Sequence, residues 1–261
     1  METKETILAK LNTSPDRLTE LVEQDGFYFV RKEITREQYP VIKQFYEYQQ
    51  RSPSPAIVTI YSVYEKEGHF YINEEWIRGE SVEEHLYLQG PFSKDEVIRY
   101  AMDLCQGLQW FHKHNMIHRD VTPANVIISE EKKAYLVDPG ILREVKKNQT
   151  NDTQILGTPG YAAPEQFGFT QSDARTDIYA LGVLINQMTT GKIPKEARPK
   201  DIRLRKIVTK CTQISAKKRY LNCHQIYKQL DAVLPEDTPA DIRFLRKIPG
   251  FRSATLWKMI L

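Results

Sequence analysis

Long hydrophobic runs, paired cysteines and a strong excess of one charge are all missing from this sequence. No run of about 18 apolar residues occurs, and the start METKETILAK lacks the apolar stretch of a signal peptide. The three cysteines, at positions 105, 211 and 223, have no Cys-x-x-Cys spacing. This excludes a disulfide framework and a zinc knuckle, and it favours a reducing cytoplasm. The formal net charge of +3 is too small to indicate nucleic-acid binding, so no nucleic-acid partner is expected.

The composition is that of a folded domain, with 41% hydrophobic and 27% charged residues in 261. Between residues 18 and 75, aromatic and β-branched residues predict strands in GFYFVRKE and QYPVIKQF, and two more around the turn Glu67–Gly68. Ser93 and Glu96 then form a capping box for a long amphipathic helix. Further helices are predicted from Asp173 and in HQIYKQLDAVL. We therefore expect a β-rich small lobe, a helical large lobe and a ligand cleft between them.

The stretch IHRDVTPANVIIS places Asp120 and Asn125 on a loop that leads into a hairpin, and the hairpin ends at Asp138. Two carboxylates and an amide at the mouth of one cleft are hard oxygen ligands, which suit Mg²⁺ shared with substrate phosphates. A carboxylate beside an incoming hydroxyl can also orient it and accept its proton. Asp120, Asn125 and Asp138 are therefore the candidate site residues.

These residues stand in motifs that resemble those of the protein kinase family, in its small bacterial serine/threonine type. HRDVTPAN resembles the catalytic loop, DPG stands where the family has D-F-G, and GTPGYAAPE resembles the end of the activation segment. DIYALG resembles the start of the buried helix that follows, and Arg219 resembles the late arginine that pairs with the A-P-E glutamate, here Glu165. The resemblance covers residues 18–232. It implies an α+β, bilobal fold with a small β-rich N-lobe, a reduced helix C and a larger α-helical C-lobe.

The resemblance also implies roles for the catalytic residues. Asp120 would be the catalytic base, and Asn125 and Asp138 would hold the Mg²⁺ that bridges the phosphates of ATP. Lys43 in PVIK matches the V-A-I-K strand, whose lysine pairs with the α- and β-phosphates. The rival is Lys32 in VRKE, which would lie on the solvent face of the preceding strand.

For the nucleoside, EEWIRGESV resembles the hinge that receives adenine. The Glu75 carbonyl and the Ile77 amide would make the adenine hydrogen bonds. Glu80 would lie near the ribose, or would equally serve as an acidic residue at a helix start.

Four departures from the family pattern stand out. Gly26 is the only glycine in LVEQDGFYF, so the phosphate-binding loop would be weakened. Only QFYEYQQRSPSP is available for helix C, which allows at most two turns, with Glu47 as the single acid for Lys43. Thr122 replaces the lysine that follows the catalytic aspartate, and Pro139 replaces the phenylalanine of D-F-G.

The activation segment offers Thr150, Thr153 and Thr158 as sites of autophosphorylation. Thr153 is favoured, because the family threonine at the position of Thr158 supports the catalytic aspartate. Arg119 would pair with a phosphorylated residue of this segment.

The sequence is thus divided into an N-terminal extension (1–17), a reduced N-lobe (18–75), a C-lobe (76–232) and a tail (233–261). The tail ends in FRSATLWKMIL, which is either a closing helix turn or a juxtamembrane segment. The predicted activity is transfer of the ATP γ-phosphate to Ser or Thr hydroxyls of protein substrates, with Mg²⁺. The alternatives are a pseudokinase that acts as a nucleotide- or protein-binding regulatory module, and a small-molecule phosphotransferase on a related fold. A cytoplasmic location is expected, with membrane association if the natural chain continues beyond residue 261.

Overall fold

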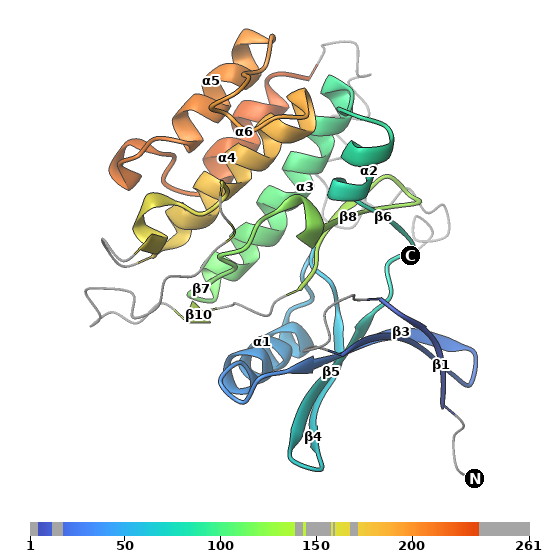
Figure 1. Ribbon diagram of the computed structural model, residues 1–261. Coiled ribbons are helices and arrows are strands. Elements are labelled where there is room, and N and C mark those ends of the chain that lie inside the picture. The colour runs from blue at the N-terminus through green and yellow to red at the C-terminus, as the bar shows by residue number, and fades with distance from the viewer. Residues whose placement is uncertain are drawn as a thin grey trace, which may run out of the picture.

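The computed structural model describes residues 5–11, 18–138, 143–144, 158, 160–167 and 172–234, which form two lobes (Figure 1). The small lobe is an antiparallel five-stranded sheet in the order β1-β2-β3-β5-β4, with one helix, α1. Its elements are β1 (Glu5–Lys10), β2 (Thr19–Gln24), β3 (Phe27–Ile34), α1 (Tyr39–Arg51), β4 (Ile60–Lys66) and β5 (His69–Glu75). The α+β, two-lobed architecture expected from the sequence is confirmed.

The sheet begins earlier in the chain than predicted. Strand β1 pairs with β2 over the register from Glu5↔Gln24 to Lys10↔Glu20, although residues 1–17 had been expected to be an extension. The two predicted strands around Glu67 and Gly68 are confirmed as β4 and β5, and both turn residues have positive φ angles, 54° and 83°. The small lobe is therefore a complete five-stranded sheet.

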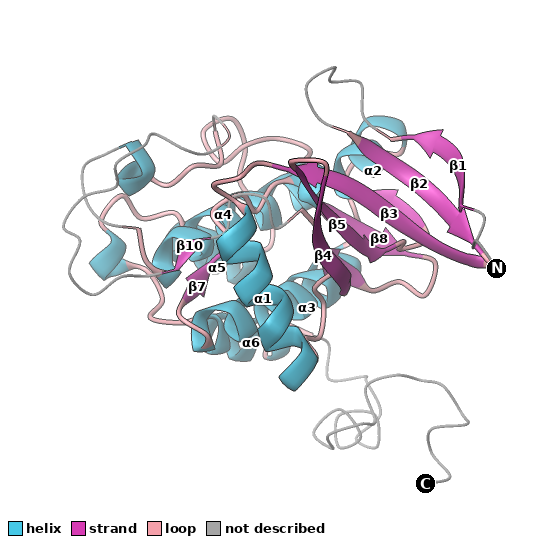
Figure 2. Ribbon diagram, turned by 90° about the horizontal axis from the view of Figure 1, so that it is seen from below, coloured by secondary structure: helices cyan, strands magenta, loops and turns pink. Residues whose placement is uncertain are grey.

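Helix α1 contradicts two predictions at once. QYPVIKQF was expected to be a strand, and helix C was expected to have at most two turns, but α1 is a helix of 13 residues. Lys43 therefore lies on a helix, where its side chain is exposed and its ammonium lies 5.8 Å from the centre of the Tyr39 ring. Figure 2 shows α1 between the sheet and the helices of the large lobe.

The start and the buried face of α1 explain why this segment is helical. Thr35 and Gln38 bond reciprocally just before it: the Thr35 amide donates to Gln38 Oε1 (2.8 Å) and the Gln38 amide donates to Thr35 Oγ1 (3.3 Å). Pro40 falls in the first turn, where the missing amide hydrogen costs nothing. The buried residues then recur at helical spacing, as Ile42, Phe45 and Gln49.

The large lobe is mainly helical. Its helices are α2 (Val82–Leu88), α3 (Lys94–Lys113), α4 (Ala174–Thr190), α5 (Ile202–Cys211) and α6 (Cys223–Asp231). Short strands form two small sheets, β6 (Gly79–Ser81) with β8 (Val126–Ser129) and β9 (Ala134–Leu136), and β7 (Met116–Ile117) with β10 (Arg143–Glu144). The capping box of Ser93 and Glu96 is confirmed at the start of α3, and Asp173 caps α4 as predicted.

The segment before β4 helps to join the small lobe to the large one. The segment before β4 runs beside β9, because the Val58 amide donates to the Leu136 carbonyl (2.9 Å) and the Leu136 amide donates to the Ala56 carbonyl (3.0 Å). Helix α3 approaches the same segment so closely that a Cβ at Gly107 would lie 2.9 Å from the Ala56 carbonyl oxygen. The segment 56–58 is thus part of both lobes.

All three cysteines are buried, free thiols in the large lobe. Cys105 lies in α3, Cys211 ends α5 and Cys223 begins α6. Burial raises the pKa of each thiol, to about 12 for Cys211. Because burial opposes ionisation, none of the three is in the reactive thiolate form at neutral pH.

In the ranges that the structure describes, no helix is long and apolar enough to cross a membrane. The segment FRSATLWKMIL, for which a closing turn and a juxtamembrane role were both left open, lies outside the described residues.

Phe45 should be the residue through which α1 is held to the large lobe. Its ring is fully buried, 5.1 Å from the ring centre of Phe111 and 5.7 Å from that of Trp110 in α3. We expect Phe45→Ala to lower the free energy of unfolding by about 3–5 kcal/mol, measured by denaturant unfolding. Gln50→Ala, at an exposed position of the same helix, is the matched control and should change it by less than about 0.5 kcal/mol. An equal effect of the two substitutions would contradict this role.

Candidate active site

Asp120 is held by hydrogen bonds to both of its carboxylate oxygens. The Asn125 side-chain amide donates to Oδ2 (2.7 Å) and to the Asp120 carbonyl (3.0 Å). The hydroxyl of Thr158, in the segment GTPGYAAPE, donates to Oδ1 (2.8 Å). The 3₁₀ turn Pro123–Asn125 brings Asn125 back towards Asp120. These hydrogen bonds hold the carboxylate in one orientation. A group that accepts a proton from a substrate hydroxyl needs such a fixed orientation.

The backbone of the catalytic loop is fixed in turn by Asp177, which is fully buried near the start of α4. Its carboxylate accepts hydrogen bonds from the His118 amide (3.0 Å) and the Arg119 amide (2.8 Å), and His112 Nε2 lies 2.8 Å from Oδ2. Burial opposes ionisation of this carboxyl, but these partners outweigh it and hold its pKa below the ordinary value. Asp177 therefore anchors the loop as a charged, saturated acceptor.

Two residues of the site have positive φ angles, Arg119 (70°) and Asp138 (58°). Neither is glycine, so each costs about 1–3 kcal/mol that the surroundings must offset. At Arg119 the offset is visible, because its amide donates to Asp177 and its carbonyl accepts from Gln166 Nε2 (3.0 Å). Gln166 also receives the Ala163 amide on Oε1 (2.9 Å), so it ties the end of the activation segment to the catalytic loop.

Lys32 lies on the sheet within electrostatic reach of Asp138, whereas Lys43 is exposed on α1. Lys32 lies on β3 and forms an ion pair with Glu74 of β5, with 2.7 Å between Nζ and Oε1. Burial alone would lower the pKa of Lys32, but the carboxylates of Glu74 and Asp138 raise it above its ordinary value. The strand expected around Lys43 is helix α1, and the solvent-facing position expected for Lys32 is wrong as well. The phosphate contact of Lys43 stays a prediction, and its exposed position on α1 argues against it.

Gly26 also lies away from the expected place. It forms the exposed turn between β2 and β3, with φ of 81°, and its amide donates to Glu23 Oε1 (2.6 Å). In the β2–β3 register Thr19 faces Lys32 while Gln24 faces Phe27, so Gly26 is at the end of the hairpin remote from Lys32. The connection at the Lys32 end is the one between β1 and β2, residues 11–18.

The predicted hinge follows β5 directly. Glu75 is the last residue of β5, and Ile77 is buried between β5 and β6. Glu80 lies on β6, but its carboxylate already contacts His85 Nδ1 (2.7 Å) and accepts from Gln89 Nε2 (3.1 and 3.2 Å). A ribose contact of Glu80 would compete with these bonds, so that role stays a prediction.

A small apolar cluster lies beside this hinge, apart from the main core. It consists of Val58, Ile77 and Val137, with Ile127 and Tyr135 packed against it. Val137 directly precedes Asp138, so the cluster connects the hinge with the candidate metal ligand. It places apolar side chains beside the backbone groups of the predicted hinge.

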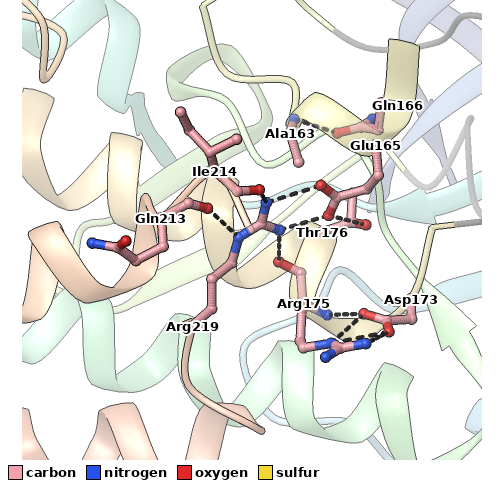
Figure 3. Close-up of polar contacts among 9 residues, drawn as sticks. All are labelled: Ala163, Glu165, Gln166, Asp173, Arg175, Thr176, Gln213, Ile214 and Arg219. Atoms are coloured by element: carbon pink, nitrogen blue, oxygen red, sulfur yellow. Dashed lines mark hydrogen bonds and ion pairs between the residues drawn. The ribbon is translucent and has the colours of Figure 1, made fainter. Parts of the chain in front are cut away.

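The end of the activation segment is fastened to the large lobe by the predicted pair of Glu165 and Arg219, which is confirmed (Figure 3). Arg219 is bidentate on Glu165, with N–O distances of 2.6 and 2.9 Å, and both side chains are buried. The remaining Arg219 donors reach the backbone carbonyls of Gln213, Ile214 and Arg175, and Thr176 Oγ1 donates to Glu165 Oε1 (3.0 Å). Every charge in this pair is compensated, which a buried pair needs to be stable.

Asn125 and Asp138 fit a magnesium site as donors. Because the Asn125 nitrogen faces Asp120, its amide oxygen points away from that carboxylate. No group of three or more His, Cys, Asp or Glu within the described part of the chain could hold a metal by itself. A set of few protein oxygens suits Mg²⁺, which keeps waters and shares ligand phosphates.

Comparison with known proteins decides the family. The model of the protein kinase domain matches residues 22–247. The chain belongs to the protein kinase family. This kinase is 36% identical over 147 residues to serine/threonine-protein kinase PknB of Mycolicibacterium smegmatis and 35% identical over the same length to PknB of Mycobacterium tuberculosis; each match covers 54% of the chain and 24% of the relative. It is 27% identical over 219 residues to a probable serine/threonine-protein kinase of Clostridium acetobutylicum, which covers 75% of the chain and 33% of the relative. The matched part thus spans about a quarter to a third of these relatives.

Among the residues that fix the candidate site, Glu74, Gln166 and Asp177 were not singled out from the sequence, and Lys32 was considered only as the rival of Lys43. Asp177 begins DIYALG, and a charged residue at the start of a helix that is otherwise apolar all round was a usable signal. Gln166 follows A-P-E directly and carried no distinguishing pattern. Of the predicted autophosphorylation sites, Thr150 and Thr153 lie outside the described residues.

The contribution of Asp177 to stability should depend on pH. Because its folded-state pKa lies below its unfolded value of about 3.9, the stabilisation is present above that pH and is lost as the pH falls through the folded-state pKa. The difference in free energy of unfolding between wild type and Asp177→Asn should therefore be largest near neutral pH and shrink below about pH 4. Asp231→Asn, at an exposed position, is the control and should follow the wild type throughout. A difference that stays constant with pH would show that Asp177 is not bound as the anion.

Removal of one partner of the Glu165–Arg219 pair should destabilise the large lobe strongly. We expect Arg219→Ala to cost about 3–5 kcal/mol in unfolding, since it leaves a buried carboxylate uncompensated. Lys94→Ala breaks a partly exposed pair with Asp201 (2.7 Å) and should cost less than about 1 kcal/mol. Similar losses in the two variants, measured by denaturant titration, would contradict the importance of the buried pair.

Proposed function

We propose that the chain is a serine/threonine protein kinase that transfers the γ-phosphate of ATP to hydroxyl groups of protein substrates, with Mg²⁺. The observation that carries this proposal is the carboxylate of Asp120, held on one oxygen by Asn125 and on the other by Thr158. A carboxylate with that support can orient an incoming hydroxyl and accept its proton. The names of the PknB relatives support serine and threonine as the acceptors.

In the proposed reaction, the substrate oxygen forms a bond to the γ-phosphorus as the bond from that phosphorus to the leaving oxygen of ADP breaks. The hydroxyl proton passes to Asp120. Asp120 does not act alone, because the loop that carries it is fixed by Asp177 and Gln166. Most of the acceleration in such a site comes from positioning and from compensation of charge.

Lys32 is proposed as the residue that contacts the α- and β-phosphates. It is the cation on the sheet that lies near Asp138, whereas Lys43 is exposed on α1. Asn125 and Asp138 would hold Mg²⁺, which supplies positive charge to the phosphates when it is bound.

Adenine is proposed to bind at the hinge, with the Glu75 carbonyl and the Ile77 amide as its hydrogen-bonding partners. The apolar cluster of Val58, Ile77 and Val137 supports this, because it offers a surface for the flat base beside those groups. Glu80 is engaged with His85 and Gln89 and is the weakest of the predicted nucleotide contacts.

A pseudokinase is the second candidate, and two observations favour it. Residues 11–18 contain no glycine, whereas several glycines are what lets a backbone approach phosphates closely. Thr122 is buried where a lysine would offset charge on the transferred phosphate. Such a protein would bind nucleotide or a partner protein without efficient transfer.

For partners and location we infer protein substrates, with autophosphorylation at Thr150 or Thr153. Thr158 is the weaker candidate, because its hydroxyl donates to Asp120 and phosphorylation would remove that bond. A cytoplasmic location agrees with three buried, free cysteines, and membrane proximity of the tail stays a prediction.

Transfer of labelled γ-phosphate from Mg·ATP tests this proposal, with the protein itself and a generic basic protein as acceptors. We expect incorporation by the wild type and a loss of at least about 100-fold in Asp120→Asn and in Asp138→Ala. Lys43→Ala should retain wild-type transfer, since this residue lies exposed on α1.

Wild-type transfer by Asp120→Asn would reject Asp120 as the base. No transfer by the wild type, together with a raised melting temperature in Mg·ATP, would favour the pseudokinase.

A further inference from the structure

The counter-ion of Lys32 comes from the sheet itself. In the β3–β5 register Val30 faces Glu74 and Lys32 faces Ile72, so Lys32 and Glu74 are diagonal neighbours on one face of adjacent strands. Their side chains meet at 2.7 Å, with relative exposures of 17% for Lys32 and 3% for Glu74. Asp138 is close enough to both for its charge to affect them. The pair thus lies within electrostatic reach of Asp138, the candidate metal ligand.

Helix α1 offers no alternative partner for Lys32. The sequence YPVIKQFYEYQQR contains one acid, Glu47, and its side chain is exposed. The buried face of the helix carries Ile42, Phe45 and Gln49 instead. The Gln49 side chain is hydrogen-bonded to the backbone at the start of β4. Its amide nitrogen donates to the Val58 carbonyl (2.9 Å), and its oxygen accepts from the Ile60 amide (3.0 Å). The predicted partnership of Lys43 and Glu47 has no support in this arrangement.

We infer that Glu74 is the residue that positions Lys32 for the nucleotide, so that the active lysine is set within the sheet and not by helix α1. The inference rests on the proposed kinase function and adds a positioning residue to it. Burial raises the pKa of Glu74 and Asp138 adds to this, whereas Lys32 acts in the opposite direction. A buried carboxylate is costly unless a cation compensates it, and Lys32 is the cation paired with Glu74.

The location of the pair has a consequence for regulation. A lysine held by a helix loses its partner when the helix moves, whereas neighbouring strands of one sheet keep their register. Lys32 should therefore keep its orientation when α1 moves. Control of activity must then act at another part of the site, such as the activation segment that carries Thr158.

Steady-state transfer by Glu74→Gln, Glu74→Asp and Glu47→Gln tests the inference, with kcat and the KM for ATP measured separately. Gln keeps the size of Glu74 but removes the charge that orients Lys32, so kcat should fall by about 10- to 100-fold. The KM for ATP should change much less, because the loss of a negative charge beside the phosphates favours binding and offsets the misplaced lysine. Glu74→Asp, which keeps the charge, should recover part of kcat, and Glu47→Gln should behave as the wild type.

A double-mutant cycle makes the assignment specific. In a Lys32→Met background, Glu74→Gln should have no further effect on kcat/KM, because Glu74 acts only through Lys32. Unchanged kcat in Glu74→Gln, additive losses in the cycle, or a loss of activity in Glu47→Gln would each overturn the inference.

A second double-mutant cycle measures the free energy of unfolding and therefore does not require an active enzyme. Lys32→Met and Glu74→Leu should each destabilise the protein, and the double variant should be more stable than either one. If the wild type transfers no phosphate, the proposed function fails and the positioning role fails with it. Coupling in unfolding would then still establish the pair, and additive single effects would reject it.

Discussion

A single buried carboxylate, that of Asp177, is the constraint on which the geometry of the large lobe depends. It joins helix α4 to the backbone of His118 and Arg119, and through His112 to helix α3. The strained Arg119 conformation needs these bonds, and the position of Asp120 follows from that conformation because the two are adjacent. The carboxylate proposed as the catalytic base is thus positioned by a fully buried residue that lies out of reach of a substrate. An anion in the core is costly, and it is retained here because three donors saturate it.

The same principle recurs at two other points of the molecule. Glu165 and Arg219 hold the end of the activation segment, and Glu74 and Lys32 form a pair between strands β5 and β3 of the small lobe. In each case a charged side chain is buried beside one partner of opposite charge. A different arrangement of the backbone would leave this buried charge without a partner. Such pairs add little to net stability compared with apolar residues, but they penalise other arrangements strongly. The site is therefore specified by electrostatics and supported by a conventional apolar core.

The parts of this structure that were predictable are those with a local signature. Asp120, Asn125 and Asp138 stand in motifs with a fixed spacing, and the capping box at Ser93 marks its helix unambiguously. The small lobe was less predictable because PVIK has the sequence pattern of the V-A-I-K strand although it lies in a helix. The competing signal was helical periodicity at Ile42, Phe45 and Gln49, preceded by the reciprocal bonds of Thr35 and Gln38. The pairing of Lys32 with Glu74 had no local signature in the sequence. It depends on the register between β3 and β5, and the two residues are 42 positions apart in the chain.

The distribution of the thiols has a practical meaning for how this molecule can be observed. Cys105, Cys211 and Cys223 all lie in the large lobe, and none is accessible in the folded protein. A thiol reagent can therefore react only when the helices that cover these side chains separate. The small lobe has no cysteine to contribute a signal. The rate of modification then reports the opening of one lobe alone, and the native chain carries its own probe for asking whether the two lobes unfold together or in sequence.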